Sequence, residues 1–231
     1  ATIPMVIGDH KDKMQKATAT TLATTVFLNR RGRFEAVPLP IEAQFAPTFG
    51  ICVADFDGDG REDLFLAQNF FAFAVEDSRL DASRGLLLRG DGRGGFTPVA
   101  GPASGLEVYG EQRGAAVTDF DHDGRTDLLV TQNGAATRLF RNTSARPGLR
   151  VRLSGPPGNP DGIGAVVRLK FSAGWGPARE VHGGGGYWSQ DSESPVLATP
   201  EQPSAILVVW PGGRRTEQSL TQIMNEVTIA Y

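Results

Sequence analysis

The chain has a single cysteine, no long apolar run and little excess of charge, and each of these absences excludes a class of protein. Cys52 is the only cysteine among the 231 residues, so no intrachain disulfide can form. It lies in the apolar run Ile51–Val53, where a buried structural thiol is the expected role. No apolar run is long enough to span a bilayer. The formal net charge of −3 provides no basic surface for nucleic acid.

The remaining composition indicates an ordinary globular protein. Hydrophobic residues make up 40% of the chain, which excludes global disorder, and 231 residues suit one large or two small domains. The sequence starts with Ala1-Thr2-Ile3-Pro4 and has no basic stretch followed by an apolar core. We therefore expect no signal peptide in it, and a mature N-terminus would look the same.

Two acidic segments are the most informative feature. Residues 55–63 read DFDGDGRED and residues 119–127 read DFDHDGRTD, an offset of 64 residues (119 − 55). Each segment has carboxylates at positions one, three, five and nine and glycine at position six. These carboxylates would repel one another unless a hard cation bound them, and Ca²⁺ takes six to eight oxygen ligands. The glycine allows the sharp turn that lets alternate side chains converge.

The sequence therefore predicts two calcium sites. We expect position seven to contribute its backbone carbonyl while its side chain points to solvent. The expected ligands are Asp55, Asp57, Asp59, Arg61 and Asp63 in the first loop, and Asp119, Asp121, Asp123, Arg125 and Asp127 in the second.

The flanking residues exclude an EF-hand. An EF-hand has a bidentate Glu at position twelve and helices on both sides, but position twelve is Leu66 in the first copy and Val130 in the second. Short apolar runs precede and follow each loop, which predicts a strand, a calcium loop and a second strand. A metal-free surface hairpin rich in Asp and Gly is the alternative, and the second copy makes it the lesser one.

The repeat extends beyond the loops, because Gly50 falls on Gly114 and Gln68-Asn69 on Gln132-Asn133. Hairpin-like segments also occur at residues 26–37 and 85–99. Repeated hairpins at this spacing favour the blades of a β-propeller. The loops and their surroundings resemble FG-GAP (VCBS-type) repeats, the blades of integrin α-subunit propellers, over roughly residues 24–142. The resemblance implies Ca²⁺ in both loops.

The chain changes character at Arg146-Pro147-Gly148, and we expect domains at residues 1–145 and 146–231. After this break, short segments alternate Val or Leu with Arg or Lys, which predicts half-buried strands in a small β-sandwich. Residues 162–167, 185–190 and 208–213 resemble the ASPIC/UnbV domain that ends many FG-GAP proteins, including the cartilage acidic protein family. The predicted fold class is thus all-β, a partial propeller followed by a β-sandwich.

A closed propeller needs at least four blades, and this chain has strands for two or three. We therefore expect it to be the C-terminal part of a longer protein, or to pair with a protein partner that covers an open edge. Calcium in place of disulfides favours an extracytoplasmic location: secreted, periplasmic or at the cell surface.

Three classes of function follow. The leading one is a non-catalytic calcium-binding module for adhesion, protein–protein contact or scaffolding. The second is carbohydrate binding, since Phe70, Phe71 and Phe73 lie in an insertion and Tyr187 and Trp188 follow a glycine run. For the aromatic residues, packing within the domain is the more common role. The third class is an enzyme, or the non-catalytic part of a polysaccharide-degrading one; no catalytic constellation can be assembled from the sequence.

Overall fold

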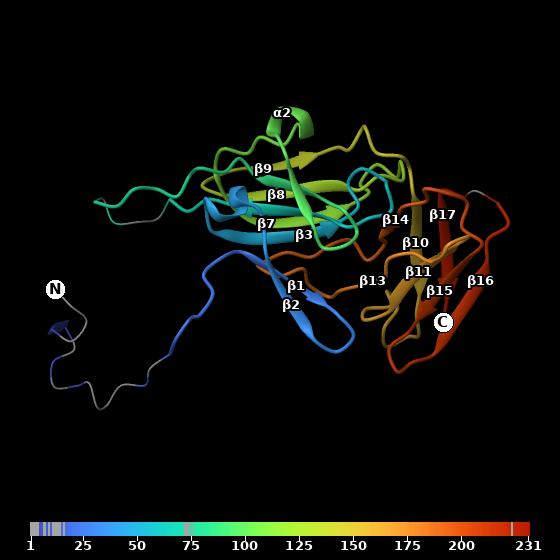
Figure 1. The fold of residues 1–231 in the computed structure, drawn as a ribbon. Coiled ribbons are helices and arrows are strands. Elements are labelled where there is room, and N and C mark those ends of the chain that lie inside the picture. The colour runs from blue at the N-terminus through green and yellow to red at the C-terminus, as the bar shows by residue number, and fades with distance from the viewer. Residues whose placement is uncertain are drawn as a thin grey trace.

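The structure is a computed structural model that describes residues 5–6, 8, 10, 15, 17–71, 74, 76–222 and 224–231. Its regular structure is almost entirely β-strand, accompanied by the short helices η2 (Ile41–Gln44) and α2 (Gly101–Ser104). The all-β prediction is therefore confirmed. Figure 1 shows an N-terminal lobe, drawn in blue to yellow-green, beside a C-terminal lobe drawn in gold to red. None of the helices described is long and apolar enough to cross a bilayer.

The N-terminal lobe contains three antiparallel sheets that follow one another along the chain. The first is the hairpin β1–β2, the second has the order β3-β4-β5-β6, and the third has the order β7-β8-β9. Their strands are β1 (Thr25–Asn29), β2 (Phe34–Pro38), β3 (Thr48–Ala54), β4 (Asp63–Gln68), β5 (Leu86–Gly90), β6 (Phe96–Val99), β7 (Glu111–Thr118), β8 (Asp127–Asn133) and β9 (Ala135–Phe140).

The second sheet is covered on both faces. Leu64 and Leu66 pack on one side with Ala43 of η2, while Phe65 packs on the other side with Val130 of β8. Alternate residues of β4 thus face two different cores, so the strand is buried from end to end. A strand covered on both faces reads as a continuous apolar run, which is why the sequence after the first loop does not alternate.

Each of the two acidic segments connects the first two strands of a sheet, as the sequence predicts. Residues 55–62 join β3 to β4, and residues 119–126 join β7 to β8. In both sheets the two strands pair antiparallel up to the loop, with Ala54 opposite Asp63 and Thr118 opposite Asp127. Across the described residues no sheet closes on itself, and a ring of blades is not evident.

The C-terminal lobe consists of two sheets around one core. One sheet has the order β14-β10-β17, and in the other the order is β12-β11-β15-β16 with β13 also paired to β11. Strands β10 and β17 run parallel, whereas the other pairs are antiparallel. The strands are β10 (Leu149–Ser154), β11 (Val166–Phe171), β12 (Gly174–Trp175), β13 (Arg179–Glu180), β14 (Val196–Leu197), β15 (Ala205–Val209), β16 (Arg215–Ser219) and β17 (Glu226–Ala230).

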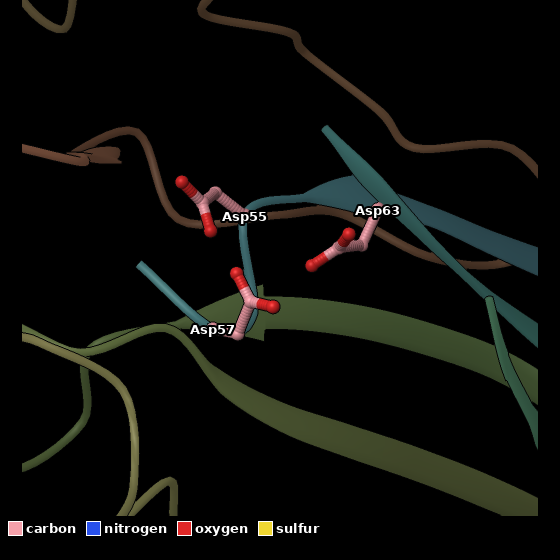
Figure 2. A group of neighbouring side chains, drawn as sticks. All are labelled: Asp55, Asp57 and Asp63. Atoms are coloured by element: carbon pink, nitrogen blue, oxygen red, sulfur yellow. The ribbon is translucent and has the colours of Figure 1, made fainter. Parts of the chain in front are cut away.

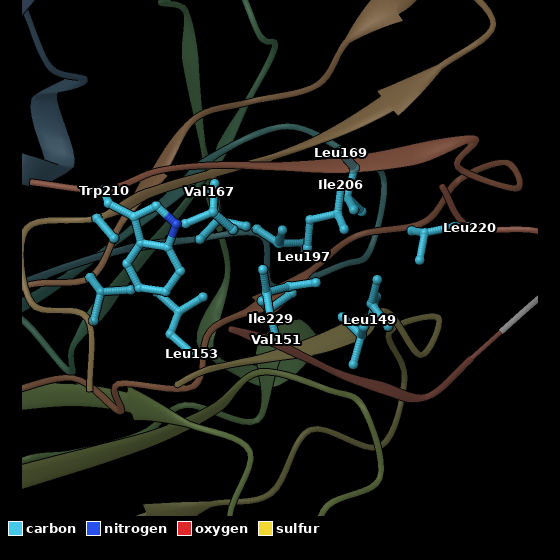
Figure 3. Close-up of a cluster of buried hydrophobic side chains, with 14 residues drawn as sticks. Leu149, Val151, Leu153, Val167, Leu169, Leu197, Ile206, Trp210, Leu220 and Ile229 are labelled. Carbon is cyan, nitrogen blue, oxygen red and sulfur yellow. The ribbon is translucent and has the colours of Figure 1, made fainter. Parts of the chain in front are cut away.

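The core of this lobe is filled from both sheets (Figure 3). Val151 and Ile229 come from the first sheet and Val167 and Ile206 from the second, and all four are buried. Trp210 closes one end of the cluster, and its indole N–H donates a 2.9 Å hydrogen bond to the hydroxyl of Thr216. The indole is thus both packed and hydrogen-bonded, which is the arrangement a buried tryptophan requires.

Replacing this indole should destabilise the C-terminal lobe strongly. We expect Trp210→Ala to lower the free energy of unfolding by about 3–5 kcal/mol, because it leaves a large cavity in the core. Trp175→Ala is the matched control, since Trp175 is 36% exposed on β12. Urea unfolding followed by circular dichroism measures both, and equal losses for the two variants would contradict the assigned core.

Candidate metal centre

The first carboxylate of each loop organises the backbone around itself. Asp55 accepts hydrogen bonds from the amides of Gly58 (2.7 Å) and Asp59 (3.2 Å) through Oδ1, and from the amide of Gly60 (2.6 Å) through Oδ2. Gly58 and Gly60 have φ of +75° and +87°, a conformation that glycine adopts without strain. The loop therefore folds over Asp55 because successive amides converge on one carboxylate.

The ninth-position carboxylate ties the loop to the third strand of its sheet. Asp63 is 2% exposed; its Oδ2 accepts the amide of Phe56 at 2.9 Å and its Oδ1 the amide of Gly90 at 2.8 Å. Phe56 belongs to the loop and Gly90 to β5. One buried side chain thus fixes the distance between the loop and a strand that lies 27 residues further along the chain.

The second loop repeats this geometry. Asp119 accepts the amides of Asp123 (2.9 Å) and Gly124 (3.2 Å), and Asp127 accepts those of Phe120 (3.1 Å) and Asn142 (2.7 Å). Asp127 is fully buried; Asn142 lies two residues after the end of β9, and Gly90 is the last residue of β5. The two loops are therefore structural copies as well as sequence copies.

Three carboxylates converge in each loop. In the first, Asp55, Asp57 and Asp63 each offer an oxygen, and these oxygens all lie within 4.8 Å of one another (Figure 2). In the second, Asp119, Asp121 and Asp127 do the same. Carboxylate oxygens at this spacing are donors that hard divalent cations such as Ca²⁺ and Mg²⁺ prefer.

Each fifth-position carboxylate binds the arginine at position seven of its own loop. Asp59 accepts the amide of Arg61 at 2.9 Å and pairs with its guanidinium at 3.2 Å. Asp123 accepts the amide of Arg125 at 3.0 Å and pairs with its guanidinium at 2.8 Å. These two carboxylates lie beside the triads and are not members of them.

The seventh-position side chains differ between the loops. Arg61 is more than half exposed, as the sequence predicts. For Arg125 the expectation of a solvent-facing side chain is wrong, because only a quarter of it is exposed and its Nε donates to the carbonyl of Ala145 at 2.8 Å. The linker to the C-terminal lobe, residues 141–148, covers this arginine, a contact that the loop sequence alone could not indicate.

Burial makes ionisation more costly for three of the six triad carboxylates, Asp55, Asp63 and Asp127. Burial first, and then the neighbouring Asp57 and Asp55 carboxylates, raise the pKa of Asp63 to about 6, against the lowering effect of its two amide hydrogen bonds. Burial likewise raises the pKa of Asp55 and of Asp127. A cation between the carboxylates would remove the repulsion that makes their ionisation costly.

Two arginines that the sequence did not single out also contact the triads. Arg89 at the end of β5 pairs with Asp57 at 2.7 Å, and Arg141 after β9 pairs with Asp121 at 2.5 Å. Neither arginine belongs to a loop motif. Only the folded sheet brings the third strand beside the loop, so spacing along the chain carried no signal for them.

Both loops also contact the linker that leads into the C-terminal lobe. A methyl group added to Gly58 would lie 2.9 Å from the backbone of Arg146, and the amide of Gly148 donates to the carbonyl of Gly124 at 2.7 Å. Further along, the amide of Val117 in β7 donates to Asp191 at 2.8 Å. The loops thus lie at the contact between the lobes.

A separate cluster gathers aromatic residues from distant parts of the chain. The Phe49 ring lies 6.0 Å from that of Phe70 and 5.6 Å from that of Tyr187, and the Arg113 guanidinium lies 4.0 Å from the centre of the Phe49 ring. Trp188 is 92% exposed and has a φ of +45°. Phe70 and Phe71 are half-buried, and Phe73 lies outside the described residues.

The remaining single residues have structural surroundings. Cys52 is fully buried, and burial raises the pKa of its thiol, which matches the predicted structural role. His122 has Nδ1 3.0 Å from the Arg150 guanidinium, and His182 lies 3.6 Å from the Glu180 carboxylate.

Comparison with known proteins identifies a family match for the C-terminal lobe. Residues 155–231, about a third of the chain, match the family described as ASPIC and UnbV, so the predicted resemblance to this domain is confirmed. The chain is also similar to cartilage acidic protein 1 of Mus musculus, at 26% identity over 205 residues that cover 84% of the chain and 30% of the relative.

Two further relatives give the same result. Cartilage acidic protein 1 of Homo sapiens is 26% identical over 84% of the chain and 30% of its own length. Cartilage acidic protein 1 of Xenopus tropicalis is 26% identical over 88% of the chain and 32% of its own length. The chain thus spans about a third of the length of the curated relatives it matches. The resemblance to FG-GAP repeats stays a prediction.

The raised pKa of Asp63 predicts an unusual pH dependence in the absence of metal. The folded chain binds a proton at Asp63 near pH 6, whereas the unfolded chain does so near the ordinary value of 3.8. Between these values the folded state holds more protons, so the free energy of unfolding should rise as the pH falls from 7 to 5. Thermal unfolding in chelator should show this rise, and Asp63→Asn should flatten it. The exposed Asp161→Asn serves as control; an unchanged slope in Asp63→Asn would refute the assignment.

Proposed function

We propose that the chain is a non-catalytic, calcium-binding β module that serves adhesion, protein–protein contact or scaffolding in a larger extracytoplasmic assembly. In this proposal residues 1–145 are FG-GAP-type propeller blades with two calcium sites, and residues 146–231 are an ASPIC/UnbV-like β-sandwich. One observation carries it: two loops 64 residues apart hold the same triad of carboxylates at the same place in two sheets.

The residues present fit the cation. Asp55, Asp57 and Asp63 would hold it in the first loop, and Asp119, Asp121 and Asp127 in the second, since their oxygens already converge within 4.8 Å. Asp59, Asp123 and the carbonyls of Arg61 and Arg125 complete the proposed ligand set. Bound Ca²⁺ would supply positive charge that balances the carboxylates and fixes the loop.

The stacking of the sheets supports propeller blades. Each neighbouring pair of sheets in the N-terminal lobe shares a core, as adjacent blades would. The outer face of the β1–β2 hairpin is apolar and uncovered: Phe27 and Phe34 lie on it and are 61% and 72% exposed. A two-stranded hairpin with apolar residues on both faces needs further protein to cover it. The remaining blades of a longer chain, or a separate partner, would do so.

The extracytoplasmic location rests on two arguments. Millimolar calcium is available outside the cytoplasm, where even sites of low affinity remain occupied. The relatives at 26% identity are named for cartilage.

Calcium should stabilise the chain, and this tests the proposal. At a concentration one hundred times the Kd, each site adds about 2.7 kcal/mol to the free energy of unfolding, equivalent to several degrees in Tm. Scanning calorimetry should show a higher Tm with Ca²⁺, a smaller rise with Mg²⁺ and a fall with chelator. Asp57→Asn and Asp121→Asn should each reduce the calcium-dependent rise, and Asp161→Asn should leave it intact. A Tm that ignores both calcium and chelator would exclude structural calcium.

The aromatic cluster favours carbohydrate binding as a second candidate function. A turn holds Trp188 outward: the amide of Gly185 donates to the carbonyl of Ser189 at 2.7 Å, and the Ser189 hydroxyl accepts the amide of Ala115 at 3.0 Å. A tryptophan at φ +45° is strained, and such strain persists where the surroundings enforce it, often at ligand sites. The exposed indole face can stack on the apolar face of a sugar ring.

Trp188→Ala tests this second function. We expect it to abolish binding on a glycan array while leaving the Tm within about one degree, because the side chain has few contacts to lose. Trp175→Ala, on the C-terminal lobe, should bind like the unaltered chain. No glycan bound by the unaltered chain, or undiminished binding by Trp188→Ala, would eliminate this role for the cluster.

A further inference from the structure

In each proposed calcium loop, an arginine from outside the loop contacts the third-position carboxylate. Arg89 contributes its Nε to Oδ2 of Asp57 at 2.7 Å. Arg141 contributes its Nε to Oδ2 of Asp121 at 2.5 Å and its Nη2 to Oδ2 of Asp123 at 3.2 Å. Asp57 and Asp121 are the third-position members of the two triads.

The two arginines occupy the same place in the two sheets. Arg89 precedes Gly90, whose amide binds Asp63, and Arg141 precedes Asn142, whose amide binds Asp127. These amides follow the ninth-position carboxylate by 27 and 15 residues, so the first copy contains 12 additional residues (27 − 15). That number equals the length of the aromatic insertion at residues 70–81. The arginines are therefore equivalent in space although the 64-residue offset does not align them.

A guanidinium and a divalent cation act on these carboxylates in the same way. Either one relieves the repulsion among the negative charges, so an arginine that relieves part of it leaves less for the metal to gain. A fixed positive charge beside the site also repels the incoming cation directly. Both effects weaken metal binding and stabilise the metal-free loop.

We propose that Arg89 and Arg141 are built-in competitors of the cation that set how tightly each loop binds calcium. This inference rests on the proposed function. In the metal-free loop each arginine holds the third-position carboxylate, and calcium binding weakens that ion pair. Arg141 contacts two carboxylates of its loop whereas Arg89 contacts one, so the second loop has the lower affinity.

The surroundings set the size of the effect. Both arginine side chains are more than half exposed, so water screens their charges, and each charge weakens calcium binding only modestly. We expect the removal of one charge to tighten the corresponding site by about three- to ten-fold. Exchange for glutamine removes the positive charge and keeps a polar side chain with an N–H donor, although a shorter one.

Calorimetric titration of the metal-free full chain with CaCl₂ tests the inference. The unaltered chain should show two affinities. Arg141→Gln should tighten the weaker site and Arg89→Gln the tighter one, while Arg141→Lys, which retains the charge, should stay close to the unaltered chain. Arg138→Gln is the matched control, since Arg138 is exposed on β9 three residues before Arg141.

The melting temperature provides a second measurement that is independent of the calorimetric titration. Without calcium, Arg141→Gln should melt at a lower temperature than the unaltered chain, and its Tm should rise further when calcium is added. Unchanged or weaker calcium affinity in Arg89→Gln and Arg141→Gln, beside normal binding by the unaltered chain, overturns the competition and leaves the calcium sites standing. Absence of calcium binding in the unaltered chain and in both glutamine variants overturns the proposed function together with this inference.

Discussion

The N-terminal lobe depends on two carboxylates buried at the start of a strand. Asp63 and Asp127 each accept one amide from the loop and one from the third strand of the sheet. A buried carboxylate is costly unless several donors surround it, and here backbone amides are those donors. The arrangement forces the loop and the third strand to meet at a fixed distance. The contact between the loop and the third strand in turn positions the other loop carboxylates and the arginines Arg89 and Arg141.

This constraint explains why the loops lie between the lobes. A loop folded tightly around Asp55 presents its backbone outward, and Gly58 and Gly60 leave room for the linker residue Arg146 and for Pro200. On the same side, Arg179 of the C-terminal lobe forms an ion pair with Glu62. The shape of the loop and the placement of the C-terminal lobe are therefore set by one set of contacts, and a change in charge at the loop acts on both.

The sequence predicted local structure well and long-range contacts poorly. The strands on either side of each loop follow from short apolar runs, and the β-rich C-terminal lobe follows from alternation in segments such as Leu149–Leu153. The convergence of Asp55, Asp57 and Asp63 also follows from spacing, because all three lie within nine residues.

What the sequence could not provide depends on residues that only folding brings together. Arg89 and Arg141 escape detection because the insertion at residues 70–81 shifts one copy against the other. Tyr187 meets Phe49 across the contact between the lobes, and no periodicity links them. The burial of Arg125 has the same origin, since the linker that covers it begins after the sheet ends.

The two loops are alike where residues interact within the loop and differ where the loop contacts distant parts of the chain. Positions one to three, five to seven and nine are identical in both copies, and these residues shape the loop and its carboxylate cluster. Position four is Gly58 in one copy and His122 in the other, both with positive φ, and position eight is Glu62 or Thr126. Gly58 packs on Arg146, whereas His122 receives a hydrogen bond from Arg150, which can only donate. The residue at position four therefore differs according to what each loop contacts toward the C-terminal lobe. The carboxylates at positions one, three, five and nine are the same in both loops.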